Sequence, residues 1–399
     1  MNKLVLLQAL LGIIVFTSCS DDPVKGYMSH RGVHLGMAVA GENSLRAATL
    51  AYNAGFNCIE TDCRYTADSV PVIMHDAKLN RTCINADGSP IKENVFVSDI
   101  TLDSLKKGYL LRVENTVLSE PVPTLKEYLE HCRDLDFKVF IEPKLNDPTG
   151  RFYSDIISTA DSVLGREGYV ICSNNFANEV IRNTLGIKDV CLMGLLYQTD
   201  YDTMAALGGN LVYAVSSVAF PYKDYYAFLE RARRDGYATQ TSCCLLSQGD
   251  QVRYDTEILV DSVPYVNYVA TDLAAPLYKD AKHRAGVLID ASSMKDCSKQ
   301  IEAIMGDYDP VAAMSGLPTG EPPVKFGAIY LEMTYTGIGD VVVDTDAFVV
   351  NSAQSGGKEA TVRYSRMVHD CLPMIMVDGL SPDFSVKSFN VKVLSFKDK

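Results

Sequence analysis

Residues 43–63 read NSLRAATLAYNAGFNCIETDC, a helical pattern that runs directly into a strand pattern. The helical part begins at Asn43, a residue type that caps helix N-termini, and it ends at Gly55. Strand and helix patterns alternate in this way from about residue 27 to residue 280. The candidate strands are GYMSH, CIETDC, VPVIMH, KVFIEPK, YVICSN, VCLMGLLY, LVYAVSS, GYATQTS and YVNYVATD. About eight such repeats predict an α/β fold, a closed (β/α)8 barrel of parallel strands, in preference to an open doubly wound sheet.

The last part of the chain has a different pattern. A Pro- and Gly-rich stretch, SGLPTGEPPVKFG, occupies residues 315–327 and is followed by β-rich runs with turn signals between them. A helical stretch leads into this region. We therefore predict a barrel at residues 23–280 and a small β-sandwich-like accessory domain at residues 281–399.

The N-terminus reads as a targeting signal. Lys3 precedes an apolar run, Leu4–Phe16, that is too short to span a bilayer. The following FTSCS resembles a bacterial lipobox, with Cys19 as the lipidated first residue of the mature protein. Residues 1–22 are thus predicted to be a lipoprotein signal peptide, and the protein a membrane-anchored lipoprotein of the bacterial cell envelope, facing the periplasm or exposed on the surface. A generic cleavable signal and an uncleaved anchor helix are the alternatives.

Charge and motifs exclude several kinds of function. The formal net charge of −13 is incompatible with the basic footprint of a nucleic-acid-binding protein. No GxGxxG or P-loop pattern follows a candidate strand, which argues against nucleotide binding. An acidic protein that acts on an anionic substrate needs a metal ion or a few placed cations. The ten cysteines after Cys19 form no CxxC pair, and several lie in apolar runs typical of small core residues.

Charged and imidazole side chains stand at the ends of the candidate strands. In a parallel barrel the carboxyl ends of the strands form one face, where active sites lie. Residues i and i+2 of a strand share a face, so side chains at this spacing point the same way. Three carboxylates and two histidines are therefore expected to converge at one mouth. The residues are His30, Arg31, Glu60, Asp62, His75, Glu142 and Lys144.

Five of these residues suit a metal ion and a phosphate. Glu60, Asp62 and Glu142 would supply the oxygen ligands that Ca²⁺ or Mg²⁺ prefers, with other positions open to water and substrate. Arg31 and Lys144 suit the charge of a phosphate. Together these residue types indicate phosphoryl chemistry on an ester, assisted by a metal.

The histidines divide into two groups. His30 and His75 suit paired acid and base catalysis near neutral pH. His34 is interpreted as lining the loop after the first strand, and His131 as a structural helix residue. Asn43 is interpreted as a helix N-cap rather than a ligand.

The segments HRG, EN, AGFNCIETDCRYTADSVPVIMHDAKLNRT, VPTLKEYLEHC and VFIEPK resemble the motifs of the glycerophosphodiester phosphodiesterase family. The resemblance covers roughly residues 28–276 and closes at YVATDLAAP. It implies a barrel of the phospholipase-C-like phosphodiesterase type. Carried over position by position, it implies a catalytic pair, His30 and His75, metal ligands Glu60, Asp62 and Glu142, and phosphate contacts from Arg31 and Lys144.

The resemblance also implies an activity. The expected reaction is metal-dependent hydrolysis of a small glycerophosphodiester to glycerol 3-phosphate and an alcohol, in which the two histidines exchange proton roles between steps. A phosphoinositide-type phospholipase acting on intact lipid and a non-catalytic surface binding lipoprotein are the alternatives. The chain departs from the family pattern at Gly41, Ser69 and Pro143, which are backbone variations. The stretch QTSCCLLSQ replaces an aromatic strand of the family, which bears on the alcohol that is accepted.

Overall fold

The computed structural model describes residues 26–34, 40–113, 116–117, 120–195, 201–216, 222–242, 266–271, 285–343, 346–353, 358–369 and 372–396. The signal peptide and Cys19 lie outside the described residues, as do most of QTSCCLLSQ and the domain boundary predicted at residue 280. In the part of the chain that is described, no helix combines the length and the apolar character needed to cross a bilayer.

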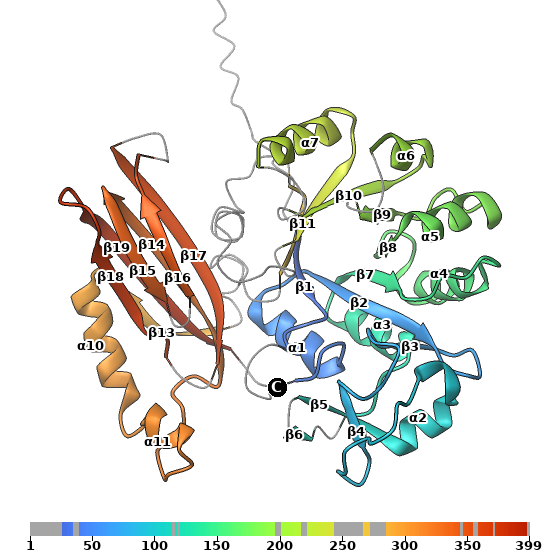
Figure 1. The fold of residues 1–399 in the computed structure, drawn as a ribbon, viewed down its shortest axis with the longest axis horizontal. Coiled ribbons are helices and arrows are strands. Elements are labelled where there is room, and N and C mark those ends of the chain that lie inside the picture. The colour runs from blue at the N-terminus through green and yellow to red at the C-terminus, as the bar shows by residue number, and fades with distance from the viewer. Residues whose placement is uncertain are drawn as a thin grey trace, which may run out of the picture.

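Eight parallel strands form a closed barrel (Figure 1). They are, in order around the barrel, β1 (Gly26–His30), β2 (Cys58–Tyr65), β7 (Lys138–Pro143), β8 (Tyr169–Ser173), β9 (Leu192–Leu195), β10 (Leu211–Ser216), β11 (Ala238–Ser242) and β12 (Tyr268–Thr271). Strand β1 closes the ring because Met28 pairs with Cys58 of β2 on one side and with Ala270 of β12 on the other. The predicted (β/α)8 barrel is confirmed.

Helices cover the outside of the barrel (Figure 1). They are α1 (Leu45–Ala54), α3 (Leu125–Asp134), α4 (Arg151–Leu164), α5 (Asn175–Glu179) with its π-helical continuation η2 (Val180–Thr184), α6 (Tyr201–Ala206) and α7 (Tyr222–Arg234). Helix α1 ends at Gly55 as predicted, where φ is +95°. The predicted N-cap was wrong by one residue: the Ser44 hydroxyl accepts the hydrogen bond from the Ala47 amide. Asn43 instead has a φ of +60° and turns its side chain into the barrel mouth.

The segment VPVIMH does not form a barrel strand. Strand β3 (Pro71–Ile73) pairs antiparallel with the end of β2, after a tight turn in which Ser69 has a φ of +58°. The hairpin brings the chain back beside β2, and the Met74 amide donates to the Asp62 carbonyl at 2.9 Å. His75 therefore reaches the mouth from a returning hairpin rather than from a parallel strand.

A small excursion follows β3, in a region where the sequence patterns predicted no elements. It contains β4 (Cys83–Asn85), η1 (Val97–Asp99), α2 (Leu102–Gly108), β5 (Tyr109–Val113) and β6 (Thr116–Val117). These elements have their own apolar cluster, which includes Leu79, Leu105 and Leu111. The excursion ends where α3 begins, at a capping box in which Thr124 and Glu127 exchange hydrogen bonds.

The C-terminal region contains two antiparallel sheets (Figure 1). The larger sheet has the order β13 (Ala285–Ala291), β19 (Ser385–Phe396), β14 (Phe326–Thr336), β17 (Glu359–His369), and the smaller has the order β16 (Asp346–Asn351), β15 (Ile338–Val343), β18 (Ile375–Gly379). Helices α10 (Met294–Met305) and α11 (Pro310–Met314) lead into β14. One apolar cluster joins both sheets, so the arrangement is the expected sandwich type.

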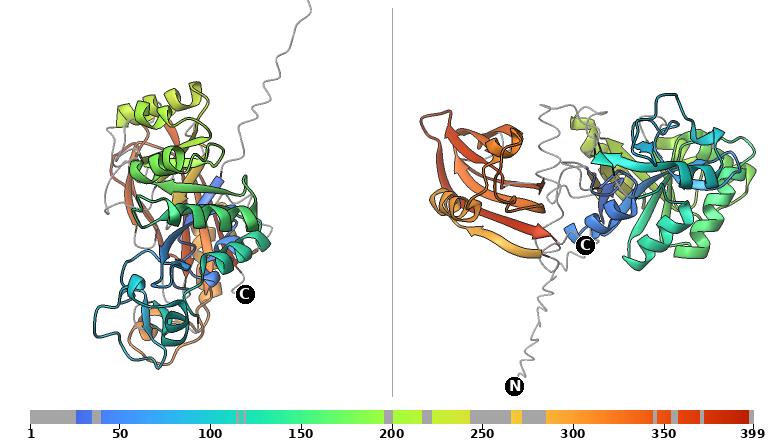
Figure 2. Two further views of the ribbon diagram at one scale, coloured as in Figure 1. Left: turned by 90° about the vertical axis from the view of Figure 1, so that its right-hand side faces the viewer. Right: turned by 90° about the horizontal axis from the view of Figure 1, so that it is seen from below.

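The larger sheet also packs against the barrel. Phe326, Ala328, Met367, Leu394 and Phe396 belong to the same apolar cluster as the buried face of α1, and β19 lies beside that helix. The right-hand view in Figure 2 shows the sandwich on one flank of the barrel. The C-terminal region is thus packed on the barrel and does not merely follow it.

Candidate active site

Neighbouring strands place the predicted site residues side by side at the carboxyl end of the barrel. In the register of the sheet, His30 of β1 pairs with Glu60 of β2, and Asp62 of β2 pairs with Glu142 of β7. Lys144 follows directly after β7. The structure therefore brings these five residues together, because i and i+2 on β2 point to one face, as the sequence pattern predicted.

The three carboxylates could hold a metal ion. One oxygen from each of Glu60, Asp62 and Glu142 lies within 4.8 Å of the other two. Glu60 and Asp62 are buried, and Oε1 of Glu60 has no hydrogen-bond partner. Burial, together with the negative charge of Asp62, raises the pKa of the Glu60 carboxyl. A buried carboxylate oxygen without a partner is costly, and a hard divalent cation with oxygen ligands would remove that cost.

Two cations lie against Asp62. Nζ of Lys144 is 3.1 Å from Oδ1 of Asp62 and 2.6 Å from Oε1 of Glu142. Nε of Arg31 is 3.2 Å from Oδ2 of Asp62. Burial alone would raise the pKa of Asp62, but Lys144 and Arg31 outweigh it, so the pKa lies below its usual value. Asp62 is therefore ionised while Glu60, a neighbour on the same strand, resists ionisation.

The loop after β1 is shaped by two residues with positive φ. Arg31 has a φ of +58° and Gly32 a φ of +76°. A Cβ on Gly32 would lie 2.7 Å from the Cβ of Ala47 in α1, so only glycine fits between loop and helix. The Arg31 amide donates to the Glu60 carbonyl at 3.1 Å, which fixes the loop over β2.

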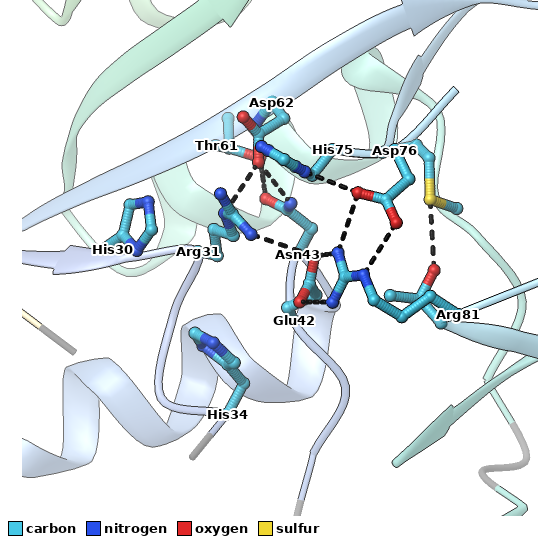
Figure 3. Close-up of polar contacts among 12 residues, drawn as sticks. His30, Arg31, His34, Glu42, Asn43, Thr61, Asp62, His75, Asp76 and Arg81 are labelled. Carbon is cyan, nitrogen blue, oxygen red and sulfur yellow. Dashed lines mark hydrogen bonds and ion pairs between the residues drawn. The ribbon is translucent and has the colours of Figure 1, made fainter. Parts of the chain in front are cut away.

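Asn43 is a site residue that the sequence interpretation missed. Its Nδ2 donates to Oδ2 of Asp62 at 2.8 Å, and its Oδ1 accepts from Oγ1 of Thr61 at 2.8 Å (Figure 3). The Asn43 amide also donates to the Arg31 carbonyl at 2.9 Å. Asn43 thus orients a candidate metal ligand; the Glu-Asn pair in the motif was the available signal.

His30 and His75 both lie at this mouth. Nε2 of His30 is 3.8 Å from Oε2 of Glu60. Nδ1 of His75 is 2.7 Å from Oδ1 of Asp76. Figure 3 shows both rings in the region of Arg31 and Asp62. The arrangement can therefore exchange protons at two points around one cluster of carboxylates.

Arg64 was also missed. It follows Asp62 on β2, and its Nε donates to the His75 carbonyl at 2.8 Å while its Nη1 donates to the Lys144 carbonyl at 3.0 Å. One guanidinium thus ties together the two backbone segments that carry His75 and Lys144. No sequence pattern reports such a contact between segments 80 residues apart.

His34 and His131 have contacts that fit structural roles. Nδ1 of His34 lies 2.9 Å from the Gly32 carbonyl of its own loop. Nε2 of His131 lies 2.8 Å from Oγ1 of Thr49, which links α3 to α1. These contacts agree with the loop and structural interpretations. The cysteines described in the structure are unpaired and largely buried, as expected for core residues.

The fold and the site together define a (β/α)8 barrel with three carboxylates that could hold a metal ion, two histidines and two cations at its carboxyl end. Residues 30–205 match the sequence model of the glycerophosphoryl diester phosphodiesterase family. This barrel segment of the chain belongs to that family.

Several known proteins are similar to parts of this chain. Glycerophosphodiester phosphodiesterase 1 of Bos taurus is 32% identical over 120 residues, which cover 29% of this chain and 33% of the bovine protein. The glycerophosphodiester phosphodiesterase of Caldanaerobacter subterraneus is 31% identical over 158 residues, which cover 39% of this chain and 61% of that protein. The chain thus spans about a third of the length of the bovine relative. A solved glycerophosphodiester phosphodiesterase from Agrobacterium tumefaciens superposes with a TM-score of 0.47 at 19% identity, covering 62% of this chain and 96% of the other.

Proposed function

We propose that the protein is a metal-dependent glycerophosphodiester phosphodiesterase that releases glycerol 3-phosphate and an alcohol. The observation that carries the proposal is the convergence of Glu60, Asp62 and Glu142 within 4.8 Å at a mouth that also holds His30 and His75. This convergence falls inside the segment that matches the family. Three carboxylate oxygens can hold a divalent ion and two imidazoles can transfer protons near neutral pH, so together they suit metal-assisted phosphodiester cleavage.

The acidic cluster is the proposed site for Ca²⁺ or Mg²⁺. Glu60, Asp62 and Glu142 would hold the ion, which when bound supplies positive charge to a phosphate oxygen and acidifies a coordinated hydroxyl. Arg31 and Lys144 add two fixed positive charges beside the same carboxylates. They suit the equatorial oxygens of a phosphodiester, where charge develops during reaction.

The histidines are the proposed proton-transfer groups. The Asp76 carboxylate accepts a hydrogen bond from Nδ1 of His75. Nε2 of His75 is therefore the nitrogen that exchanges a proton with the substrate. His30 lies on β1, beside Glu60 of β2. In the first step one imidazole takes the proton of the glycerol 2-hydroxyl as this oxygen attacks phosphorus, and the other protonates the oxygen of the alcohol that leaves. Water then opens the resulting cyclic phosphate to glycerol 3-phosphate, and the two imidazoles exchange roles.

A lipid anchor at Cys19 is the proposed route to the membrane, on the strength of the lipobox-like FTSCS sequence. Cell fractionation of a Cys19→Ala variant tests this separately from catalysis. Release of the variant into the soluble fraction is the expected result, and continued membrane attachment would rule out anchoring at this residue.

The decisive experiment assays the purified protein on a panel of glycerophosphodiesters and intact phosphoinositides, with Ca²⁺, with Mg²⁺ and with excess chelator. We expect turnover of the deacylated diesters only with metal. Glu60→Gln should lose metal-dependent turnover, whereas Glu179→Gln, the same change at an exposed position on α5, should not. Full activity in chelator would overturn the metal assignment. Activity on intact lipid alone would favour a phospholipase, and no activity at all would favour a binding protein.

A further inference from the structure

Arg81 lies at the rim of the site and binds two carboxylates from different parts of the chain (Figure 3). Its Nη1 and Nη2 donate to Oε2 and Oε1 of Glu42, both at 2.7 Å. Its Nε and Nη2 donate to Oδ2 and Oδ1 of Asp76, at 2.7 Å and 3.0 Å. Four charge-assisted hydrogen bonds thus hold one guanidinium between the loop before α1 and the loop after β3.

Each carboxylate makes a further contact that points into the site. Oδ1 of Asp76 accepts from Nδ1 of His75 at 2.7 Å, and Oε1 of Glu42 accepts from Nη1 of Arg31 at 3.3 Å. The five side chains form a row of alternating charge in which Arg81 is the middle member. The row connects a proposed proton-transfer group at one end with a proposed phosphate contact at the other.

We infer that Arg81 is a positioning residue, which acts on His75 through Asp76 and on Arg31 through Glu42. This inference rests on the proposed function. An ionised Asp76 can only accept, so Nδ1 of His75 must carry the hydrogen and Nε2 is left for the substrate. Arg81 keeps Asp76 ionised and fixes the plane of its carboxylate, and it does the same for Glu42 beneath Arg31.

Stability alone does not account for this arrangement. The Arg81 side chain is 50% exposed, and exposed ion pairs contribute little to the free energy of unfolding. The molecule contains a matched arrangement away from the site: Arg166 binds Asp161 at 2.6 Å and Asp189 at 3.0 Å. Arg166 precedes β8, at the end of the barrel opposite the mouth. It therefore serves as the control for a bridging arginine that positions no site residue.

The test compares kcat and KM of wild type, Arg81→Lys, Asp76→Asn, the double variant and Arg166→Lys on a glycerophosphodiester with Mg²⁺. Lysine keeps the charge but cannot bind both carboxylates with two hydrogen bonds each. We expect each site variant to lower kcat about 10–100-fold, the usual effect of losing a partner of a site residue. Arg81→Lys should also raise KM because Glu42 no longer orients Arg31, whereas Asp76→Asn should leave KM near wild type.

The double variant should be no worse than the more damaging single variant, because both changes break one row of contacts. Arg166→Lys should retain wild-type kinetics. Three results would each overturn the inference. The losses of the two single variants could multiply in the double variant, the kcat of Arg81→Lys could lie within about twofold of wild type, or Arg166→Lys could lose as much activity as Arg81→Lys. If thermal unfolding shows that Arg81→Lys is not folded, the test rests on Asp76→Asn, which should lower kcat and leave KM unchanged.

A spectroscopic measurement separates this inference from the proposed function. Imidazole ¹⁵N NMR should show the Nδ1–H tautomer for His75 in the wild type and a mixture of tautomers in Arg81→Lys and Asp76→Asn, with no change in Arg166→Lys. If the wild type hydrolyses no diester but the tautomer responds in this way, the proposed function fails and the positioning role stands. If the wild type is active and the tautomer does not respond, the positioning role fails.

Discussion

The barrel mouth and the C-terminal sandwich bury their side chains in opposite ways. At the mouth, Glu60 and Asp62 are 6% and 0% exposed and lie on one face of one strand. In the described part of the sandwich, Ser352 is the only buried residue of polar type. Its core is a continuous apolar cluster that includes Ile329, Val341 and Val391.

The difference shows what each region is built for. Burying two carboxylates in contact lowers stability unless cations or a metal compensate, and here Lys144 and Arg31 compensate only Asp62 directly. A fold retains such a cost where the charges do chemistry. The sandwich carries no such cost, and its apolar contacts extend onto α1, the helix that follows the Asn43 turn. The mouth therefore gathers the groups suited to chemistry, whereas the sandwich adds apolar contacts against α1.

The largest expected effect lies at the mouth. His30→Ala and His75→Ala should each lower kcat by on the order of 10²–10⁴, which is the usual effect of a positioned acid or base. The losses should be non-additive because both groups serve the same steps. Steady-state kinetics on a glycerophosphodiester measures this. His34→Ala is the control, since His34 bonds its own loop; an equal loss there with an active His75→Ala would move the chemistry to the HRGVH loop.

The next effect lies where the two regions meet. Leu394→Ala on β19 should destabilise the protein by about 2–5 kcal/mol, the usual cost of removing a buried leucine side chain. Turnover per folded molecule should stay near wild type. Val386→Ala, on the same strand but 37% exposed, should change stability far less. Urea unfolding measures both. Equal small effects would mean that the sandwich does not support the barrel.

A smaller effect should distinguish chemistry from stability within the mouth. Glu60→Gln replaces a buried carboxyl group, whose ionisation is opposed by burial and by Asp62, with a neutral amide, so the Tm in chelator should equal or exceed that of the wild type. Added Mg²⁺ should raise the Tm of the wild type and not that of the variant. Differential scanning calorimetry checks both statements. A clear fall in the Tm of the variant in chelator would show that Glu60 stabilises the fold.

The smallest effect concerns acid stability at the rim. The hydrogen bond from Arg81, with a further one from His75, holds the pKa of Asp76 well below its usual range. A lowered folded-state pKa adds stability above the unfolded value of about 3.9, and this stability is lost as the pH falls further. The difference in unfolding free energy between wild type and Asp76→Asn should thus be largest near neutral pH and shrink below about pH 4. A difference independent of pH in urea unfolding would contradict this account.

Most of the barrel and much of the site could be predicted because they depend on short-range pattern. Alternating strand and helix signals predicted the barrel, and the spacing of Glu60 and Asp62 predicted a shared face. Residue type and position predicted His30 and His75 as a pair, and the family resemblance implied the same pair. Asn43 and Arg64 were not predictable in this way, because their roles depend on contacts across distant segments.

One wrong prediction and one feature that was not predicted have specific physical causes. VPVIMH has the composition of a buried strand, but the turn at Ser69 is too short for a helical crossover, so the strand had to return antiparallel. The docking of the sandwich left a signal that was not used: β14 begins with the run FGAI, which has no polar side chain, and all four of these residues are buried in the structure. A strand buried on both faces has such a run, and one facing solvent does not.

The ammonium of Lys144 gives the acidic cluster an internal counter-ion. It lies between Asp62 and Glu142, two of the three proposed ligands. A divalent cation bound by the three carboxylates would then compete with this ammonium for the oxygens of Asp62 and Glu142. Removing the resident charge with Lys144→Met should strengthen metal binding in calorimetry while weakening phosphate binding. The lysine would thus set a lower limit on the ion concentration at which the enzyme switches on.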